Sequence, residues 1–481
     1  MKAYRITALM LVCVTSLGSY GLSANEEISY HLSFFVITGC LILQSALEIY
    51  SESKYSDYIW ANPIVLCSLY IFVLGFGVTN AGFLLYRDFA FLTDVTGSEL
   101  YKWANRVVGL SLVSSVGMWL GYRSGIARKL EFGAKNSQLL ARLIKTGSHP
   151  RWIAIHVSFF VAVVAETYLL STGILGWYNI PGESVLPYIQ FLGLLTSLQY
   201  IAPIVVSFWY ASTRKEKHLY VAIFFVTVQV LVGLPHGMKE AIIKPLIPPL
   251  IAFYIGSKKI PWSGAYASAL VFVGSFILVG EMRSQLWRLN SRGSFQAATS
   301  VVLNTSPQDY STTFWETSKS VVTRLNFTGR ALAVIESQKN GLDEEAPNFR
   351  KKLLLSPAMA VIPRAIWPSK PKNEGGRWAY SEVTGKPVPK FGGFNNTGMT
   401  PVAYLFIVGG ALLCFLGFFL IGLVQRAVKP MAYTYGIGGL IFFITILSPL
   451  VQVDNLFHAA LIKIIRFSLI GIVAQFLLLK K

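Results

Sequence analysis

The most constraining feature of this sequence is a series of apolar runs, each roughly 18 to 25 residues long, separated by polar loops. A run of this length crosses the hydrocarbon core of a bilayer as one α-helix, whereas the strands of a membrane β-barrel are shorter and alternate in polarity. The residues are 53% hydrophobic and only 14% charged, which is more apolar than soluble domains are. The sequence therefore predicts an all-α integral membrane protein.

The length criterion gives about twelve candidate transmembrane helices. Their approximate ranges are 6–24, 31–49, 63–86, 104–122, 152–174, 187–210, 218–234, 241–256, 264–282, 400–424, 432–451 and 456–479. Loops with several cations, such as STRKEKH and GSKKIPW, alternate with loops that have none, such as GWYNIPGESV and VQVD. Because cytoplasmic loops are enriched in Lys and Arg, this alternation predicts that both termini are cytoplasmic.

One long segment divides the chain into three parts. Residues 1–282 form a bundle of about nine helices, residues 283–398 form a large loop outside the membrane, and residues 399–481 add about three helices. Loops of this length are functional or disordered. Apolar residues at helical spacing, Val321, Val322, Leu325, Leu332 and Ile335, predict one or two amphipathic helices in the loop. These helices either lie along the membrane surface or fold back over the bundle.

The long loop carries more cations than carboxylates, and two of its cations lie among prolines. Arg364 and Lys370 belong to the stretch VIPRAIWPSKP, residues 361–371, in which proline restricts the backbone. The planar guanidinium of arginine binds phosphate through two hydrogen bonds, and lysine adds a point charge. A diphosphate on a lipid carrier fits this arrangement, and the alternative is attraction to anionic lipid headgroups.

Three further arginines are candidates for the same diphosphate. Arg288 and Arg292 follow the ninth helix and share one face if that helix continues. Their alternative role is to anchor the helix end at the membrane surface. Arg330 begins an apolar helical turn, so we expect it to face a ligand or a carboxylate.

Two other places carry ionisable residues that suit chemistry. In LPHGMKEAIIKP, which brings His236 and Glu240 together, His236 is a candidate general base, although a histidine in a loop is often merely solvated. Lys463 and Arg466 lie inside the last apolar run, where ionisable groups are usually functional, and the alternative is pairing with a bundle carboxylate. The sequence contains no Walker-type loop, HExxH motif, GxSxG elbow or paired-cysteine site, so we expect no metal and no cofactor.

The layout and two motifs resemble a known family. The motifs are IPRAIWPSKP in the late outside loop and TGMTPVAY at the start of the next helix. They resemble bacterial oligosaccharide repeat-unit polymerases of the Wzy type; the layout is similar over nearly the whole chain, and the specific part covers about residues 324–404. The resemblance implies a GT-C-type glycosyltransferase of the bacterial inner membrane. Such an enzyme moves a growing glycan from undecaprenyl diphosphate onto a new lipid-linked repeat unit at the periplasmic face, and so makes O-antigen, capsular polysaccharide or exopolysaccharide.

The resemblance also implies roles for individual residues and partners. Arg364 would bind the donor diphosphate, supported by Arg330, Lys370 and Arg377, without a metal. The turn that holds His236 departs from the arginine-containing turn expected in many polymerases, so His236 and Glu240 stay alternative bases for the acceptor hydroxyl. The expected partners are undecaprenyl-diphosphate-linked oligosaccharides, membrane lipids, a flippase and a chain-length regulator, but not nucleic acid.

Three other classes of protein compete with the polymerase. An O-antigen ligase shares the bundle and the late loop, and the IPRAIWPSKP stretch favours the polymerase over it. A flippase for lipid-linked oligosaccharides would suit Lys463 and Arg466, but transporters usually have two matching halves and short loops. A scaffold that only binds other membrane proteins would leave the cations in the apolar run unexplained.

Overall fold

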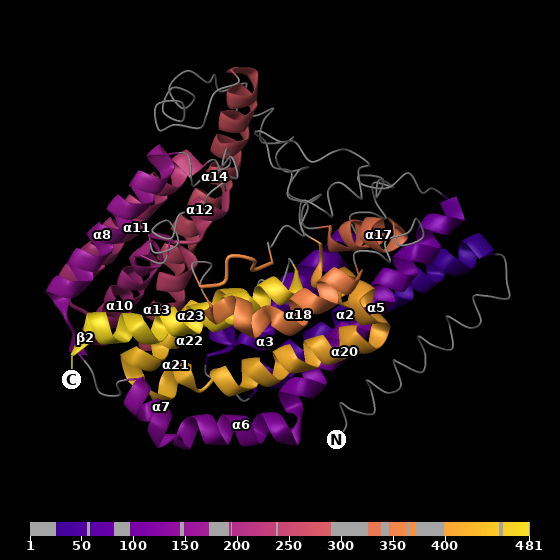
Figure 1. Cartoon of the computed structure of the whole chain (residues 1–481), viewed down its shortest axis with the longest axis horizontal. Coiled ribbons are helices and arrows are strands. Elements are labelled where there is room, and N and C mark those ends of the chain that lie inside the picture. The colour runs from indigo at the N-terminus through magenta and orange to yellow at the C-terminus, as the bar shows by residue number, and fades with distance from the viewer. Residues whose placement is uncertain are drawn as a thin grey trace.

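The computed structural model is almost entirely helical (Figure 1). It describes residues 26–54, 58–80, 97–144, 149–172, 192–193, 195–236, 239–289, 326–337, 346–362, 366–371, 399–451 and 456–480. The predicted helix at 6–24 lies outside these residues, as do Val321, Val322 and Leu325 of the predicted loop helices.

Within the described residues, 6 helices are long and apolar enough to cross a membrane. They are Ser33–Ser53, Trp152–Ser171, Glu216–His236, Glu240–Ser257, Pro401–Thr434 and Phe457–Leu478. Pro63–Val78 and Gly436–Val451 are apolar but shorter. The composition therefore predicted the class of the protein, an all-α membrane protein, whereas fewer than the twelve expected spans reach full length among the described residues.

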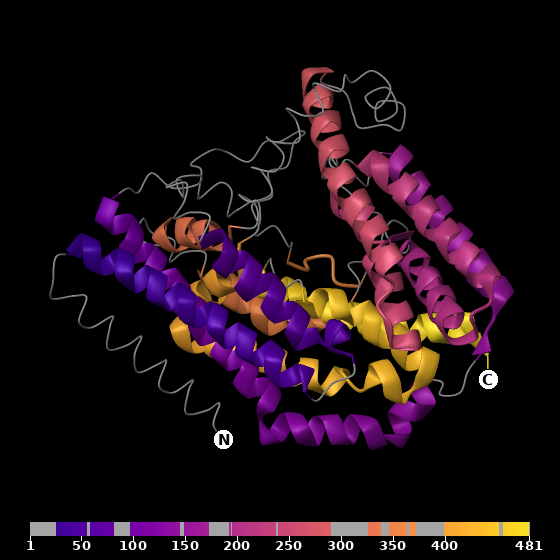
Figure 2. The same cartoon turned by 180° about the vertical axis from the view of Figure 1, so that it is seen from behind.

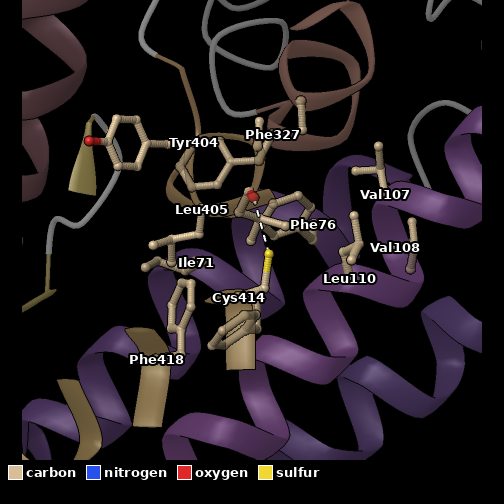
Figure 3. Packing of buried hydrophobic residues seen from close by; sticks show 14 of the residues in the cluster. Ile71, Phe76, Val107, Val108, Leu110, Phe327, Tyr404, Leu405, Cys414 and Phe418 are labelled. Carbon is tan, nitrogen blue, oxygen red and sulfur yellow. Dashed lines mark hydrogen bonds between the residues drawn. The ribbon is translucent and has the colours of Figure 1, made fainter. Parts of the chain in front are cut away.

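The first of two helical groups contains helices from both ends of the chain. It consists of α2 (Glu26–Ser53), the short 3₁₀ helix η1 (Ile59–Ala61), α3 (Pro63–Cys67), the π-helix η2 (Ser68–Val78), α5 (Gly97–Arg123) and α20 (Pro401–Val428). Phe72, Phe76 and Phe418 lie in its apolar core, part of which Figure 3 shows. Helices α5 and α20 approach closely, because a Cβ on Gly117 would lie 2.6 Å from the Phe415 carbonyl oxygen. Small residues permit such contacts between membrane helices.

The second group stands beside the first (Figures 1 and 2). It consists of α8 (Trp152–Ser171), α10 (Ser197–Thr213), α11 (Glu216–Gly233), the 3₁₀ turn η3 (Leu234–His236), α12 (Lys239–Ile243), α13 (Ile247–Ser257) and α14 (Trp262–Leu289). The rings of Phe159 in α8 and Phe225 in α11 stack with their centroids 4.0 Å apart in its core.

Two late helices connect the groups. They are α22 (Gly436–Val451) and α23 (Phe457–Leu478). Phe457 at the start of α23 belongs to the core of the first group, and Ala474 near its end belongs to the core of the second. After α23, β2 (Leu479–Lys480) pairs antiparallel with β1 (His149–Pro150), which precedes α8.

Helix α20 is broken at two glycines. Gly410 has φ +70° and ψ −164°, a conformation that residues with a side chain rarely adopt. Cys414 Sγ donates a hydrogen bond to the Val402 carbonyl oxygen at 3.4 Å. In a straight helix these residues would be about 18 Å apart, so residues 401–408 must fold back on the rest of α20. A span that looks continuous in the sequence is therefore a short helix, a sharp turn and a longer helix.

Part of the predicted outside loop folds back onto the first group. The described loop helices are α17 (Phe327–Ser337) and α18 (Ala346–Val361). Phe327 inserts beside η2, where Gly75 makes room, because a Cβ there would lie 2.7 Å from Phe327 Cε2. Leu332 and Ile335 are fully buried, so α17 folds back over the bundle and does not lie along the membrane surface.

Paired charges gather where α2, α5 and α20 end. Glu52 is 2% exposed; its Oε1 lies 2.7 Å from Arg123 Nη2, and its Oε2 lies 3.0 Å from Lys429 Nζ. Asn62 Nδ2 and Tyr122 Oη also donate to Oε2, at 2.8 and 3.0 Å. Both oxygens of this buried carboxylate are therefore occupied.

A second carboxylate extends this cluster onto the amphipathic helix α6 (Gly125–Asn136), which leads through α7 (Gln138–Leu143) towards β1. Glu131 of α6 pairs with Arg426 and with Lys135. Burial raises the pKa of Glu131, but the hydrogen bond from Lys135 and the attraction of Arg426 outweigh this effect and leave the pKa lowered. The Glu52 and Glu131 ion pairs are called the closed cluster below. The Glu52 pairs connect α2, α5 and the end of α20, and the pair of Glu131 with Arg426 fixes α6 against α20.

A further contact holds the C-terminal end of α6. Helix α21 (Met431–Thr434) follows α20, and the Tyr435 hydroxyl after it donates to the Ala134 carbonyl oxygen of α6.

Candidate functional site

A buried histidine and carboxylate meet in the second group. Helix α11 continues into η3, which places His236 Nε2 2.6 Å from Glu166 Oε1 of α8. His236 is 9% exposed and Glu166 is 4% exposed. Among the described residues, the Nδ1 atom of His236 has no hydrogen-bond partner. A carboxylate on one nitrogen fixes the orientation of the imidazole and stabilises its protonated form, so the other nitrogen can accept a proton.

Other polar residues of the same turn gather around Tyr200 of α10. Lys244 Nζ lies 4.9 Å from the centroid of the Tyr200 ring. Tyr200 is also within electrostatic reach of Glu166 and Glu240. Glu240 is exposed at the start of α12, whereas His236 is buried. Of the two candidate bases, only His236 has a carboxylate partner among the described residues.

Sequence reasoning did not single out Glu166. It is the only carboxylate of the apolar run Trp152–Ser171. The argument that ionisable groups inside apolar runs are functional, which was applied to Lys463 and Arg466, would have found it.

A second polar site lies where α18 meets α20 and α23. Arg350 Nε donates to the Val408 carbonyl oxygen at 2.7 Å, just before the break in α20. The Tyr404 hydroxyl donates to the Phe349 carbonyl oxygen at 3.1 Å and lies 2.9 Å from His458 Nδ1. Tyr404 belongs to the TGMTPVAY motif, so that motif holds the loop helix against the bundle.

Two of the predicted cations bind carbonyl groups at the end of α18. Arg466 Nη2 and Nε donate to the Met359 and Ala360 carbonyl oxygens, each at 3.2 Å. Lys370 is 7% exposed, and its Nζ donates to the Ile362 carbonyl oxygen at 2.8 Å. The last carbonyls of a helix lack partners within it and attract cations. The described partners of Arg466 are therefore carbonyl groups and not a carboxylate, while Lys463 is exposed.

The remaining predicted cations are spread more widely. The Arg330 guanidinium lies 4.6 Å from the centroid of the Phe327 ring. Arg364, Arg377 and Arg292 lie outside the described residues, as does the side chain of Arg288 in α14. No hydrogen bond or ion pair within the described part of the chain joins these cations to the His236 and Glu166 pair. The same residues contain no group of three or more His, Cys, Asp or Glu side chains that could hold a metal ion.

Comparison with known proteins gives one match. A family model described as a domain of unknown function, DUF8712, matches residues 159–481, which is more than half of the chain. No curated protein and no solved structure matches. The matched part runs from α8 to the end of the chain and includes His236, Glu166 and the loop helices. The chain belongs to the DUF8712 family.

Proposed function

We propose that this protein is a glycosyltransferase that polymerises undecaprenyl-diphosphate-linked repeat units at the periplasmic face of the bacterial inner membrane. The observation that carries the proposal is the buried pair of His236 and Glu166, at 2.6 Å. The charge pattern of the loops predicts that this end of α8 and α11 lies on the same side of the membrane as the basic loop, which supports the proposal. A base and a set of phosphate-binding cations on one side are what glycosyl transfer from a diphosphate carrier requires.

The pair accounts for activation of the acceptor. His236 Nδ1 takes the proton of the acceptor hydroxyl, and Glu166 stabilises the imidazolium that forms. The hydroxyl oxygen then bonds to the anomeric carbon of the donor glycan, while the bond from that carbon to the diphosphate oxygen breaks. The electron pair leaves with the diphosphate, whose charge Arg364, Arg330 and Arg377 stabilise.

Lys370 has a positioning role in this proposal. Its bond to the Ile362 carbonyl oxygen joins the two ends of the proline-containing stretch, and Arg466 holds the α18 turn before it. Arg364 lies in sequence between these anchored ends. The twelve-helix layout with a GT-C-like bundle, and the division at residues 282 and 399, belong to the same proposal.

A second candidate is a flippase for lipid-linked oligosaccharides, which the broken helix α20 favours. Discontinuous membrane helices line the substrate sites of many transporters. The break in α20 is held by Arg350 of the loop helix α18, so binding at the loop could act directly on it.

The test is an electrophoretic ladder of surface polysaccharide from cells that lack this protein, combined with probing of lipid-linked intermediates on each membrane face. A polymerase predicts that long chains vanish while single repeat units still reach the outside. A flippase predicts that the intermediates stay on the cytoplasmic face, and a ligase predicts that long chains form without transfer to lipid A core.

Complementation with Arg364→Ala tests the diphosphate role. The variant should reach the membrane but restore no long chains, whereas Arg142→Ala, an exposed arginine of α7, should restore the full ladder. Long chains in cells with Arg364→Ala would exclude the role of Arg364.

A further inference from the structure

Three buried polar side chains lie on three helices of the second group. They are Glu166 of α8, Gln199 of α10 and Gln229 of α11, and they are 4%, 1% and 3% exposed. The side-chain amide nitrogen of Gln229 donates to the backbone carbonyl oxygen of Gln199, which connects α11 to α10 directly. These three side chains are called the polar layer below.

Along α8 and α11, the polar layer follows an apolar core and precedes His236. Phe159 and Phe225 stack in that core. On α11, Gln229 follows Phe225 by one turn, a rise of about 6 Å on the same face. On α8, Glu166 follows Phe159 by two turns, a rise of about 10 Å on the same face. His236 continues the face of α11 that carries Phe225 and Gln229. The faces of α8 and α11 that carry Phe159 and Phe225 in the core therefore carry polar side chains closer to His236.

The polar layer has unmet hydrogen-bonding capacity. Within the described part of the chain, four of its side-chain atoms have no hydrogen-bond partner: Nε2 and Oε1 of Gln199, Oε1 of Gln229 and Oε2 of Glu166. Most buried polar atoms in proteins do have one. These four atoms, contributed by α8, α10 and α11, are free to bind a ligand or water.

The kinds of atom determine the class of ligand. Gln199 Nε2 is a donor, whereas Gln199 Oε1, Gln229 Oε1 and Glu166 Oε2 are acceptors. A bound anion would need donors, and a bare metal ion would use only the oxygens. A hydroxyl group both donates and accepts, so a ligand with several hydroxyls meets both requirements.

We propose that the polar layer binds the hydroxyl groups of a sugar residue of the acceptor and so brings the acceptor oxygen to His236. This inference rests on the proposed function for the identity of the ligand. Ordered water has the same hydrogen-bonding chemistry, and the experiment below separates the two.

The experiment measures binding of an oligosaccharide to the full-length protein in lipid nanodiscs by calorimetry. The probe is the repeat unit released by mild acid from lipid-linked intermediates of the same cells. The variants Gln199→Leu and Gln229→Leu remove one amide each at nearly constant volume. The matched control is Gln475→Leu in α23, because Gln475 is 0% exposed and its amide atoms also have no partner among the described residues.

The inference predicts at least tenfold weaker binding by Gln199→Leu and Gln229→Leu, and unchanged binding by Gln475→Leu. The midpoint of thermal unfolding, measured on all variants, checks that they are folded; if Gln199→Leu does not fold, Gln199→Met repeats the test. Equal binding by all proteins, or no binding by the wild type, would show that only water fills the polar layer and would overturn the inference.

A second arm separates this inference from the proposed function. Chain elongation is measured in cells that lack the protein and in cells that carry the wild-type protein or His236→Asn. If the oligosaccharide binds through the two glutamines but elongation does not need the protein, the sugar site stands and the polymerase is excluded. If elongation needs His236 while binding is insensitive to both glutamines, the polymerase stands and the sugar site is excluded.

Discussion

The closed cluster and the polar layer each bury a carboxylate, but only one of them uses both of its oxygens. Glu52 of the closed cluster is bound by Arg123, Lys429, Asn62 and Tyr122. Glu166 of the polar layer is bound by His236 through Oε1, and its Oε2 has no partner among the described residues. A carboxylate with both oxygens bound holds helices together, whereas we propose that the unbound oxygen of Glu166 and the nearby glutamines bind a ligand.

The largest effect on stability is expected from Glu52→Gln. The change leaves Arg123 and Lys429 near each other without a counter-charge, which should cost about 3 kcal/mol. This value is at the low end for buried pairs, because the Arg123 side chain is 22% exposed. It is measured as the free energy of unfolding in detergent. The matched control, Glu240→Gln at an exposed position, should change it by less than about 0.5 kcal/mol. If Glu52→Gln lowered the free energy of unfolding by as little as this control, the closed cluster would not hold the first group together.

Glu166→Gln should lower the activity strongly and leave the stability of the protein nearly unchanged. It keeps the shape of the side chain but cannot stabilise a protonated His236, so elongation should fall by at least about 100-fold, which is roughly 3 kcal/mol in the barrier. The stability should change by less than about 1 kcal/mol, because one of its oxygens is already without a partner. Elongation is followed in vitro with lipid-linked repeat units. If stability fell while elongation per folded molecule was unchanged, Glu166 would be structural like Glu52.

Gly410→Ala tests the sharp turn in α20. The carbonyl oxygen of Val408, just before this turn, accepts a hydrogen bond from Arg350 of α18. At φ +70° and ψ −164° a side chain is strained, so the variant should lose about 2 kcal/mol of unfolding free energy. Gly274→Ala in α14 is the control; a Cβ there meets nothing within 4 Å, and alanine should be neutral or slightly stabilising. Equal stability of both variants would argue against the fold-back of residues 401–408.

The smallest effect is expected from acid. Because the folded pKa of Glu131 is lowered, its ion pairs stabilise the protein above the ordinary value of 4.5, and this contribution is lost as the pH falls below it. Unfolding midpoints of the wild type should therefore drop more steeply below about pH 4.5 than those of Glu131→Gln. Parallel curves would mean that the pairs with Arg426 and Lys135 do not form.

The sequence predicts the helical class well and particular sites less well, for physical reasons. The apolar runs predict helices because the length of a membrane span is fixed by the bilayer. Gly409 and Gly410 did not reveal the break in α20, because glycine occurs in many continuous membrane helices. The partners of Arg466 and Lys370 could not be predicted, because backbone carbonyls occur at every residue and have no sequence signature. Glu166 could have been found, since a lone carboxylate in an apolar run is visible in the sequence.

The central claim is that the His236 and Glu166 pair activates the acceptor, and the most direct test is a polysaccharide ladder from cells complemented with His236→Asn. The exposed His149→Asn serves as the control at equal membrane abundance. The account predicts single repeat units without long chains for His236→Asn and a full ladder for His149→Asn. A full ladder from His236→Asn would contradict the claim and leave the pair as a structural contact between α8 and η3.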